Sequence, residues 1–181
     1  MIFCETKLKG AFFIEIEPIE DERGFFARSF CVREFSGRGL NPRIVQTNIS
    51  FNKKKGTIRG MHYQAAPHAE AKVVLCLKGA IYDVIIDLRP ESLTYKQWIS
   101  EELSAENHKM LYIPEGFAHG FQTLEDNNEV FYLMSEFYHP ESARGVRFDD
   151  PIFGIKWPLE HSTVSEKDRA YPLFVDLKSN S

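Results

Sequence analysis

The sequence predicts a mostly β protein, an antiparallel jelly-roll sandwich or barrel with a few short helices. Two observations predict this fold. Short runs rich in β-branched and aromatic residues recur along the 181 residues, and Gly, Pro or Asn-Asn turns separate them. Many short strands at this spacing are typical of sandwiches and barrels. No repeat, low-complexity tract or linker-like segment interrupts the pattern, so residues 1–181 are predicted to form a single domain.

The predicted strands share this composition and lie, in chain order, at residues 11–19, 25–30, 44–51, 72–79, 80–90, 97–103, 109–116, 119–125 and 129–138. Helical periodicity is brief, at residues 32–40 and near residues 165–170. Since residues two apart in a strand share a face, Lys72 and Cys76 are expected to point the same way. Polar groups on the concave face of a jelly roll would line a pocket.

The composition is that of a packed globular protein. Hydrophobic residues make up 43% of the chain, which is too high for a disordered segment. The net charge of −4 gives no indication of a nucleic-acid or membrane partner, and no segment approaches 18 uninterrupted apolar residues. Three cysteines, Cys4, Cys31 and Cys76, form no CxxC pair. We therefore expect a soluble cytoplasmic protein with reduced thiols.

A metal site is suggested by one motif and opposed by another. Residues 114–119 have the Pro-x-Gly-x-x-His spacing of the second motif in metal-binding cupin barrels. The first cupin motif requires a His-x-His pair, whereas this chain has His62-Tyr63-Gln64. His62, His119 and Glu70 could nominally supply three ligands, but Glu70 lies off the motif's spacing. We expect no functional metal.

A base-catalysed reaction is the alternative for His62. An imidazole with an ordinary pKa of about 6.5 can abstract a proton next to a carbonyl. Lys72 could stabilise the resulting oxyanion, Tyr132 could donate a proton, and Asp168 could orient His62. Spacing alone leaves each of the four open to a structural or surface role, because every chain of this size contains such residues.

Two arginines next to glycines, Arg23 and Arg59, could bind a phosphate through their planar guanidinium groups. A turn arginine facing solvent is an equally good interpretation of either. Phe26 and Tyr138 are core or edge residues by default, and either could stack on a nucleotide base at a pocket mouth.

Taken together, the motifs resemble one family, the dTDP-4-dehydrorhamnose 3,5-epimerases of nucleotide-sugar metabolism. The matching segments are "DERGFF", "QTNIS", "GTIRGMHYQ", "DVIIDLRPESLTY", "YIPEGFAHGF", "DDPIFGIKWP" and "SEKD", in this order over nearly the whole chain. The resemblance implies a cupin-type jelly roll that is metal-free, needs no organic cofactor and forms a homodimer. It implies a reaction at C3 and C5 of a 4-keto-6-deoxyglucose nucleotide.

The resemblance also assigns roles to residues of this chain. His62 with Asp168 would remove the proton next to the C4 ketone, Lys72 would steady the enolate, and Tyr132 would donate a proton. The implied substrate-binding residues are Arg23, Phe26, Gln46, Asn48, Arg59, His119, Tyr138 and Lys167. Phe26 and Tyr138 would stack on the base, from different subunits in one arrangement.

Three departures from the family pattern keep the substrate open. Arg28 and Ala143 stand where the family often has Glu, and Phe148 stands where it usually has Trp. A guanidinium in place of a carboxylate changes the local charge by two, which can alter nucleotide preference. The departures at Arg28 and Ala143 therefore keep open an epimerase acting at one carbon or on a CDP-linked deoxysugar. Two alternatives do not depend on these departures: a metal-carrying cupin isomerase or oxygenase, and a non-catalytic carbohydrate-binding jelly roll.

Overall fold

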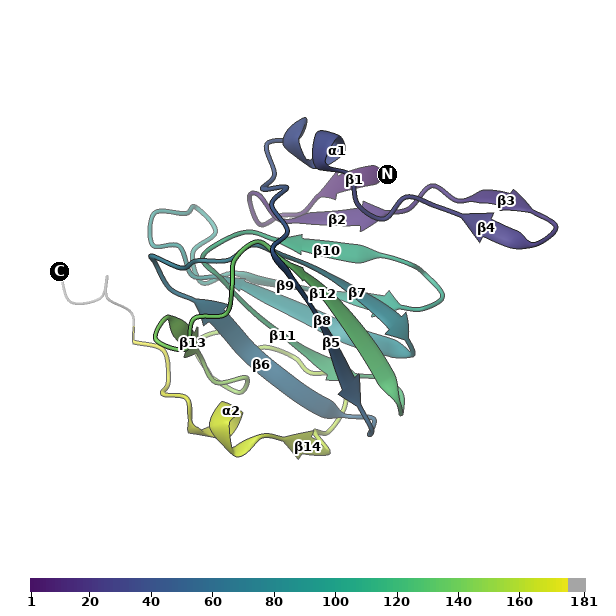
Figure 1. Ribbon diagram of the computed structural model, residues 1–181. Helices are drawn as coiled ribbons and strands as arrows, with labels where there is room; N and C mark the ends of the chain where they lie inside the picture. The colour runs from purple at the N-terminus through teal and green to yellow at the C-terminus, as the bar shows by residue number, and fades with distance from the viewer. Residues whose placement is uncertain (176–181) are drawn as a thin grey trace.

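Two β-sheets packed face to face form the body of the protein (Figure 1). The computed structural model describes residues 1–175, so residues 176–181 of the predicted domain lie outside the described part. The first sheet contains, in spatial order, β1 (Ile2–Glu5), β2 (Phe12–Glu15), β10 (Met110–Ile113), β7 (Lys72–Lys78), β12 (Asn128–Met134) and β5 (Gln46–Asn52). Each neighbouring pair in this sheet is antiparallel.

The second sheet contains β13 (Ala143–Gly145), β6 (Thr57–Gln64), β11 (Phe117–Thr123), β8 (Ala80–Asp87) and β9 (Trp98–Ser104), with β14 (Thr163–Val164) pairing β6. The β14–β6 pair is parallel, and the other pairs are antiparallel. Among the described residues, two short helices complete the fold, α1 (Val32–Ser36) and α2 (Glu166–Ala170). The predicted mostly β jelly roll with short helices is confirmed. No helix among residues 1–175 is long and apolar enough to cross a membrane.

Alternation along the strands explains how both faces of each sheet are covered. In β7, Val74 and Cys76 point into the main core between the sheets, while Val73 packs outward under Phe35 of α1. In the second sheet the segment after β13 covers the outer face with Val146, Phe153 and other apolar residues. Central strands are therefore buried on both faces, and all seven residues of β11 are buried.

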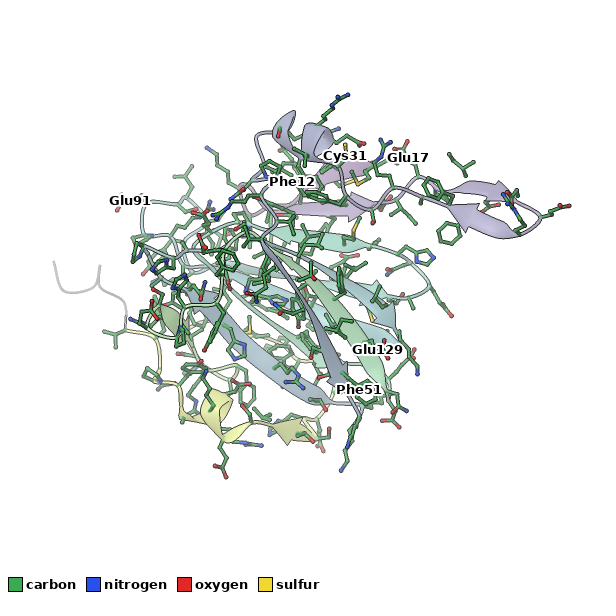
Figure 2. The ribbon with its side chains drawn as sticks, viewed as in Figure 1. Phe12, Glu17, Cys31, Phe51, Glu91 and Glu129 are labelled. Carbon is green, nitrogen blue, oxygen red and sulfur yellow. The ribbon has the colours of Figure 1, made fainter. Side chains whose placement is uncertain are left out.

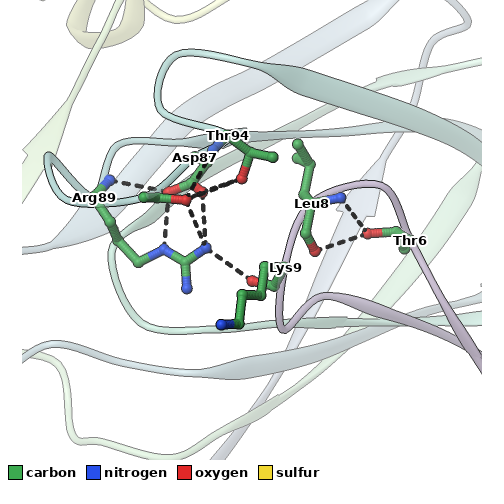
Figure 3. Close-up of polar contacts among 7 residues, drawn as sticks. Thr6, Leu8, Lys9, Asp87, Arg89 and Thr94 are labelled. Atoms are coloured by element: carbon green, nitrogen blue, oxygen red, sulfur yellow. Dashed lines mark hydrogen bonds and ion pairs between the residues drawn. The ribbon is translucent and has the colours of Figure 1, made fainter.

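A polar cluster fixes the loop that follows β8 (Figure 3). The buried Asp87 carboxylate accepts hydrogen bonds from Arg89, Ser92 and Thr94, and Arg89 Nη2 also donates to the Lys9 carbonyl at 2.8 Å. Burial acts to raise the pKa of Asp87, but the hydrogen bonds from the other three side chains outweigh it and lower the pKa. The cluster thereby ties the end of the second sheet to the turn between β1 and β2.

A third, two-stranded sheet projects from the body. It is the hairpin of β3 (Ile19–Asp21) and β4 (Gly24–Phe26), which extends to one side of the sandwich (Figure 1). All six strand residues are exposed, among them Ile19 and Phe26. Exposed apolar side chains on a projecting hairpin are one mark of an interaction surface.

Predicted and observed strands differ mainly where the chain changes partners. The predicted strand 11–19 is wrong as a continuous unit, because β2 ends at Glu15 and the chain crosses Pro18 into the separate hairpin. The predicted strand 25–30 ends at Phe26, since the residues that follow have no strand partner and lead into α1. Four strands, β1, β6, β13 and β14, are outside the predicted list. β6, β13 and β14 pair with segments far away in the chain, whereas β1 pairs with the neighbouring β2.

Candidate active site

A pocket of about 640 Å³ opens between the two sheets, beside α2. It collects all four predicted catalytic residues and every predicted binding residue except two; the members are His62, Asp168, Lys72, Tyr132, Gln46, Asn48, Arg59, His119, Tyr138 and Lys167. The side chains come from β5, β7 and β12 of one sheet, β6 and β11 of the other, α2, and the segment between β12 and β13, which carries Tyr138. Residues scattered over more than a hundred positions of the chain therefore face one cavity.

His62 and Asp168 form a hydrogen-bonded pair at one wall of the pocket. His62 Nε2 lies 2.6 Å from Asp168 Oδ1. The carboxylate is held in turn by the Gly60 amide, and the Asp168 amide donates to the Ser165 hydroxyl that caps α2. Burial acts to raise the pKa of Asp168, but the hydrogen bond from His62 and further interactions lower it. An imidazole that donates through Nε2 keeps its lone pair on Nδ1, which is the state a general base needs.

Gly60 allows the strands to meet closely behind this pair. Its φ is +127°, and a Cβ atom there would lie 2.5 Å from Gly120 Cα and 2.8 Å from the His119 carbonyl oxygen. The glycine is therefore required by both conformation and space, and it supplies the amide that contacts Asp168.

Lys72, at the start of β7, is buried at the pocket floor. Its Nζ lies 2.9 Å from Glu70 Oε1. Across the ladder Lys72 pairs with Met134 of β12, and two positions along that strand Tyr132 pairs with Asn48 of β5. This register explains why a lysine, a tyrosine and an asparagine far apart in the chain share one face.

Tyr132 lies beside His119, with the two ring centroids 6.1 Å apart in an edge-to-face arrangement. Burial raises the pKa of Tyr132, and the nearby Asp83 carboxylate adds to the effect. The phenol is therefore held in its protonated form, which is the form that can donate a proton.

His119 forms a second histidine–carboxylate pair. Its Nε2 lies 2.7 Å from Asp83 Oδ1 on neighbouring β8, and both side chains are buried. Asp83 Oδ2 has no hydrogen-bond partner among the described residues. Sequence reasoning missed Asp83; the available signal was a carboxylate in the otherwise apolar run "YDVII".

Three cations at the pocket wall have no carboxylate within ion-pair distance in the part of the chain that the structure describes. Arg59 donates to the Asn52 side chain and the Phe51 carbonyl, and Arg144 of β13 donates to the Glu141 and Ala143 carbonyls. Lys167 of α2 is the third. Cations without anionic partners are the groups with which a phosphate-bearing ligand would pair. Arg144 is a pocket residue that sequence reasoning missed.

The remaining predicted binding residues lie near the pocket mouth or away from it. Gln46 Nε2 donates to Asn48 Oδ1, and the exposed Tyr138 donates its amide to Gln46 Oε1. Arg23 and Phe26 do not line this pocket, because both lie on the projecting hairpin. Phe26 is 75% exposed, and the Arg23 side chain, 84% exposed, pairs with Asp21.

Gln64 has a structural task at the position where metal-binding cupins have a second histidine. Its amide nitrogen donates to the His68 and Phe137 carbonyls, and its Oε1 accepts from the His139 amide. The buried side chain thus joins the two loops at the pocket mouth. The nominal metal ligands of the motif are all engaged elsewhere, with His62, His119 and Glu70 each paired to a charged neighbour.

Within residues 1–175 one other cluster brings three donor atoms close together: His68, His139 and Glu141. The two imidazole rings are stacked, with centroids 3.5 Å apart and planes 7° from parallel. A metal ion binds in the plane of each imidazole at about 2.0 Å. Two stacked parallel rings share no such point, so this arrangement is not that of a coordinating pair.

The three departures have different surroundings. Ala143 lines the pocket, whereas Arg28 forms an exposed ion pair with Glu34 and does not line it. Phe148 is buried against Ile58 and Val164 in a small satellite core. A change at Ala143 can therefore act directly on a ligand in this pocket.

Comparison with known proteins places these features in context. The family model described as dTDP-4-dehydrorhamnose 3,5-epimerase matches residues 5–176. The chain is 45% identical to the enzyme of that name from Methanothermobacter thermautotrophicus over 92% of this chain and 91% of the relative. It is also similar to the crystal structure of dTDP-4-dehydrorhamnose 3,5-epimerase from Bacillus anthracis with TDP and PPi bound (TM-score 0.92, 41% identity, 96% and 99% coverage). A third similar protein is dTDP-6-deoxy-D-glucose-3,5-epimerase from Legionella pneumophila in complex with dTDP-4-keto-L-rhamnose (TM-score 0.90, 38% identity, 98% and 95% coverage).

Proposed function

Because the chain belongs to the dTDP-4-dehydrorhamnose 3,5-epimerase family, we propose that it converts dTDP-4-dehydro-6-deoxy-D-glucose to dTDP-4-dehydro-L-rhamnose. It is an isomerase-type enzyme, and the hypothesis of a non-catalytic binding module is set aside. The observation that carries the proposal is the convergence of the His62–Asp168 pair, Lys72 and Tyr132 on one pocket.

The proposed reaction begins with proton removal by His62. The C–H bond next to the C4 ketone breaks, the proton passes to Nδ1 of His62, and the electron pair moves onto the C4 oxygen. Asp168 orients the imidazole and stabilises the imidazolium that forms. The Lys72 ammonium stabilises the negative charge of the enolate oxygen.

Inversion then requires a proton from the opposite face. Tyr132, whose phenol is kept protonated by burial, donates its O–H proton to the carbon. The proton gained by His62 and the proton lost by Tyr132 are afterwards exchanged with solvent. The same steps at the second carbon adjacent to the ketone complete the 3,5-epimerisation.

The nucleotide part of the substrate is assigned to the unpaired cations and the pocket mouth. Arg59 and Lys167 would contact the diphosphate, with Gln46, Asn48 and His119 holding the sugar and Tyr138 stacking on the base. The polar lining from both sheets supports a nucleotide-sugar ligand, in which a charged diphosphate lies between the uncharged sugar and the uncharged base.

We further infer that the enzyme is a homodimer in which the hairpin of one subunit completes the pocket of the other. Arg23 and Phe26 are predicted substrate contacts, yet they lie outside the pocket of their own chain. The edge strand β5 exposes Ile49 and Phe51, the latter opposite Glu129 of β12 (Figure 2). An exposed apolar edge strand and a projecting apolar hairpin are complementary features for a two-fold contact.

Subunit mixing tests this arrangement. A His62→Ala subunit paired with an Arg23→Ala subunit has one site with both His62 and Arg23 only if Arg23 acts across the interface. We expect equal mixing to restore about a quarter of parental activity. Activity of the mixture no higher than the mean of the two variants would contradict the shared site. Light scattering would measure the mass of the particle in solution and so test the dimer directly.

The compartment is proposed to be the cytoplasm. All three cysteines are free thiols, and Cys76 is buried with its pKa raised to about 11 by burial. Reduced cysteines support a reducing compartment.

The experiment that tests the proposed function is proton NMR in D₂O with dTDP-4-dehydro-6-deoxy-D-glucose. We expect loss of the C3 and C5 proton signals together with appearance of the L-rhamno product. Washout at one position only would indicate a single-carbon epimerase. Absence of exchange would reject the proposed substrate, and the CDP-linked sugar would then be tested in the same way.

A further inference from the structure

Glu70 is a buried carboxylate in the pocket for which the proposed chemistry gives no role. Its side chain is 9% exposed, and its Oε1 lies 2.9 Å from Nζ of Lys72, whose side chain is 6% exposed. Glu70 also lines the cavity that holds His62 and Tyr132. A buried carboxylate is costly unless it is paired or used, and among residues 1–175 its ion-pair partner is the proposed enolate-stabilising lysine.

Backbone contacts on both sides of Glu70 hold this carboxylate in place. The Ala71 amide donates to the Ser135 hydroxyl at 2.7 Å, and the Ser135 amide donates to the Ala71 carbonyl at 2.9 Å. Upstream, the His68 carbonyl accepts from Gln64. Glu70 is therefore fixed between two anchored backbone positions, unlike an exposed glutamate on a mobile loop.

The charges of the pocket follow a pattern that includes Glu70. Each of the three basic groups predicted to act on the sugar has one carboxylate: His62 has Asp168, His119 has Asp83, and Lys72 has Glu70. The cations assigned to the diphosphate, among them Arg59 and Lys167, have no carboxylate partner among the described residues. The basic groups at the sugar end of the pocket are thus each matched by a carboxylate, and the cations without a carboxylate lie where the diphosphate is expected.

We propose that Glu70 is a positioning residue that keeps the Lys72 ammonium protonated and directed at the C4 oxygen of the substrate. A buried ammonium without an anion loses its proton readily, and a neutral amine cannot stabilise an enolate by charge. The fixed Glu70 carboxylate favours the charged ammonium form of Lys72. It also balances the charge of Lys72, so that Lys72 does not attract the diphosphate into the sugar end of the pocket. This role rests on the proposed epimerase function.

The first test compares Glu70→Gln with the parent across pH. We expect kcat to fall about 10- to 100-fold near pH 8, with KM changed by less than about threefold, because charge stabilisation is lost in the transition state and ground-state contacts remain. The alkaline decline of kcat should begin at lower pH in Glu70→Gln. Glu70→Asp, which keeps the carboxylate, should restore part of kcat. Its alkaline decline should begin at a pH closer to that of the parent. Glu141→Gln, an exposed glutamate outside the pocket, serves as the matched control.

The second test does not depend on turnover. Amine acylation at fixed pH, followed by peptide mass spectrometry, measures how much of each lysine is neutral, with the surface lysines as internal references. We expect Lys72 to react about tenfold faster in Glu70→Gln than in the parent, since a loss of about 1.4 kcal/mol in charge stabilisation is a factor of ten. If the parent fails to epimerise its substrate while Lys72 reactivity responds to Glu70, the proposed function fails and the Glu70–Lys72 coupling stands.

A purely structural Glu70 gives a different result. The Glu70→Gln protein would then lose thermal stability but keep the parental pH profile of kcat and the parental Lys72 reactivity. Either an unchanged profile or an unchanged labelling rate in a folded Glu70→Gln protein would overturn the proposal.

Discussion

His62 Nε2 and Asp168 Oδ1 lie 2.6 Å apart although the two residues are 106 positions apart in the chain. The contact joins β6 of the second sheet to the short helix α2, which is capped by Ser165 and held against β6 by β14. Since the imidazole is fixed by a buried carboxylate, its tautomer and its direction are set before substrate arrives. This preorganisation supports the proposed role of His62 as the general base.

Substitution of His62 by Ala should abolish epimerisation and leave binding largely intact. Removal of a general base costs at least about 100-fold in rate, and the binding groups are other residues. Calorimetry with dTDP and proton exchange in D₂O would measure the two properties on the same sample. His68→Ala, in the loop outside the pocket, is the control, and a His62→Ala turnover within a few-fold of the parent would show that His62 is not the base.

Asp168→Asn should lower kcat by at least about 100-fold, because the amide can hold the imidazole in the wrong tautomer and cannot stabilise its cation. Because the pKa of Asp168 is lowered in the folded protein, its carboxylate contributes stability above its unfolded pKa near 3.9. That contribution is lost as pH falls through the folded value. The melting temperatures of the parent and the Asp168→Asn protein should therefore differ at pH 7 and converge towards pH 3. A constant difference over this pH range would contradict a stabilising contribution from the ionised carboxylate.

Tyr132→Phe should separate proton removal from proton return. We expect solvent exchange of the substrate protons to continue through His62, while formation of the inverted product falls about 100-fold or more. Since the pKa of Tyr132 is raised by burial, its ionisation should not limit activity below about pH 10. Loss of both proton exchange and inversion in a folded Tyr132→Phe protein would show that Tyr132 does not act only as the proton donor.

Arg144→Ala should weaken nucleotide binding. Loss of one hydrogen-bonded cation to a charged group costs about tenfold in affinity or more, and the effect should appear in KM, with kcat nearly unchanged. Arg147, which is also on the surface but is paired with Asp149 and lies outside the pocket, provides the control. Equal KM values for the Arg144→Ala and Arg147→Ala proteins would remove Arg144 from the binding site.

Asp87→Asn should destabilise the fold without touching the pocket. The substitution leaves Arg89 without its buried anion, which costs about 3 kcal/mol in free energy of unfolding. Because the pKa of Asp87 is lowered, the difference between parent and variant should be largest above about pH 4 and shrink as pH falls further. Urea denaturation of the parent and the Asp87→Asn protein at pH 7 and pH 3 measures this difference in free energy of unfolding at each pH.

The fold class could be predicted because its signals are local. The runs that became β7 to β12 carry β-branched and aromatic residues between turn residues, and each is recognisable without its partners. The predictions that were wrong concern partner choice. The run at 11–19 has strand composition throughout, yet its two parts pair in different sheets.

The sequence by itself determined the jelly-roll class and the residue types of the proposed proton-transfer site, because composition and motif spacing are properties of short segments. Only the tertiary structure decided that Glu70 pairs with Lys72, that Asp83 stands behind His119, and that Gln64 joins two loops. It also placed Arg23 and Phe26 outside the pocket of their own chain. These relationships depend on sheet register and loop closure between distant segments, and no local pattern encodes which partner a buried charge will meet.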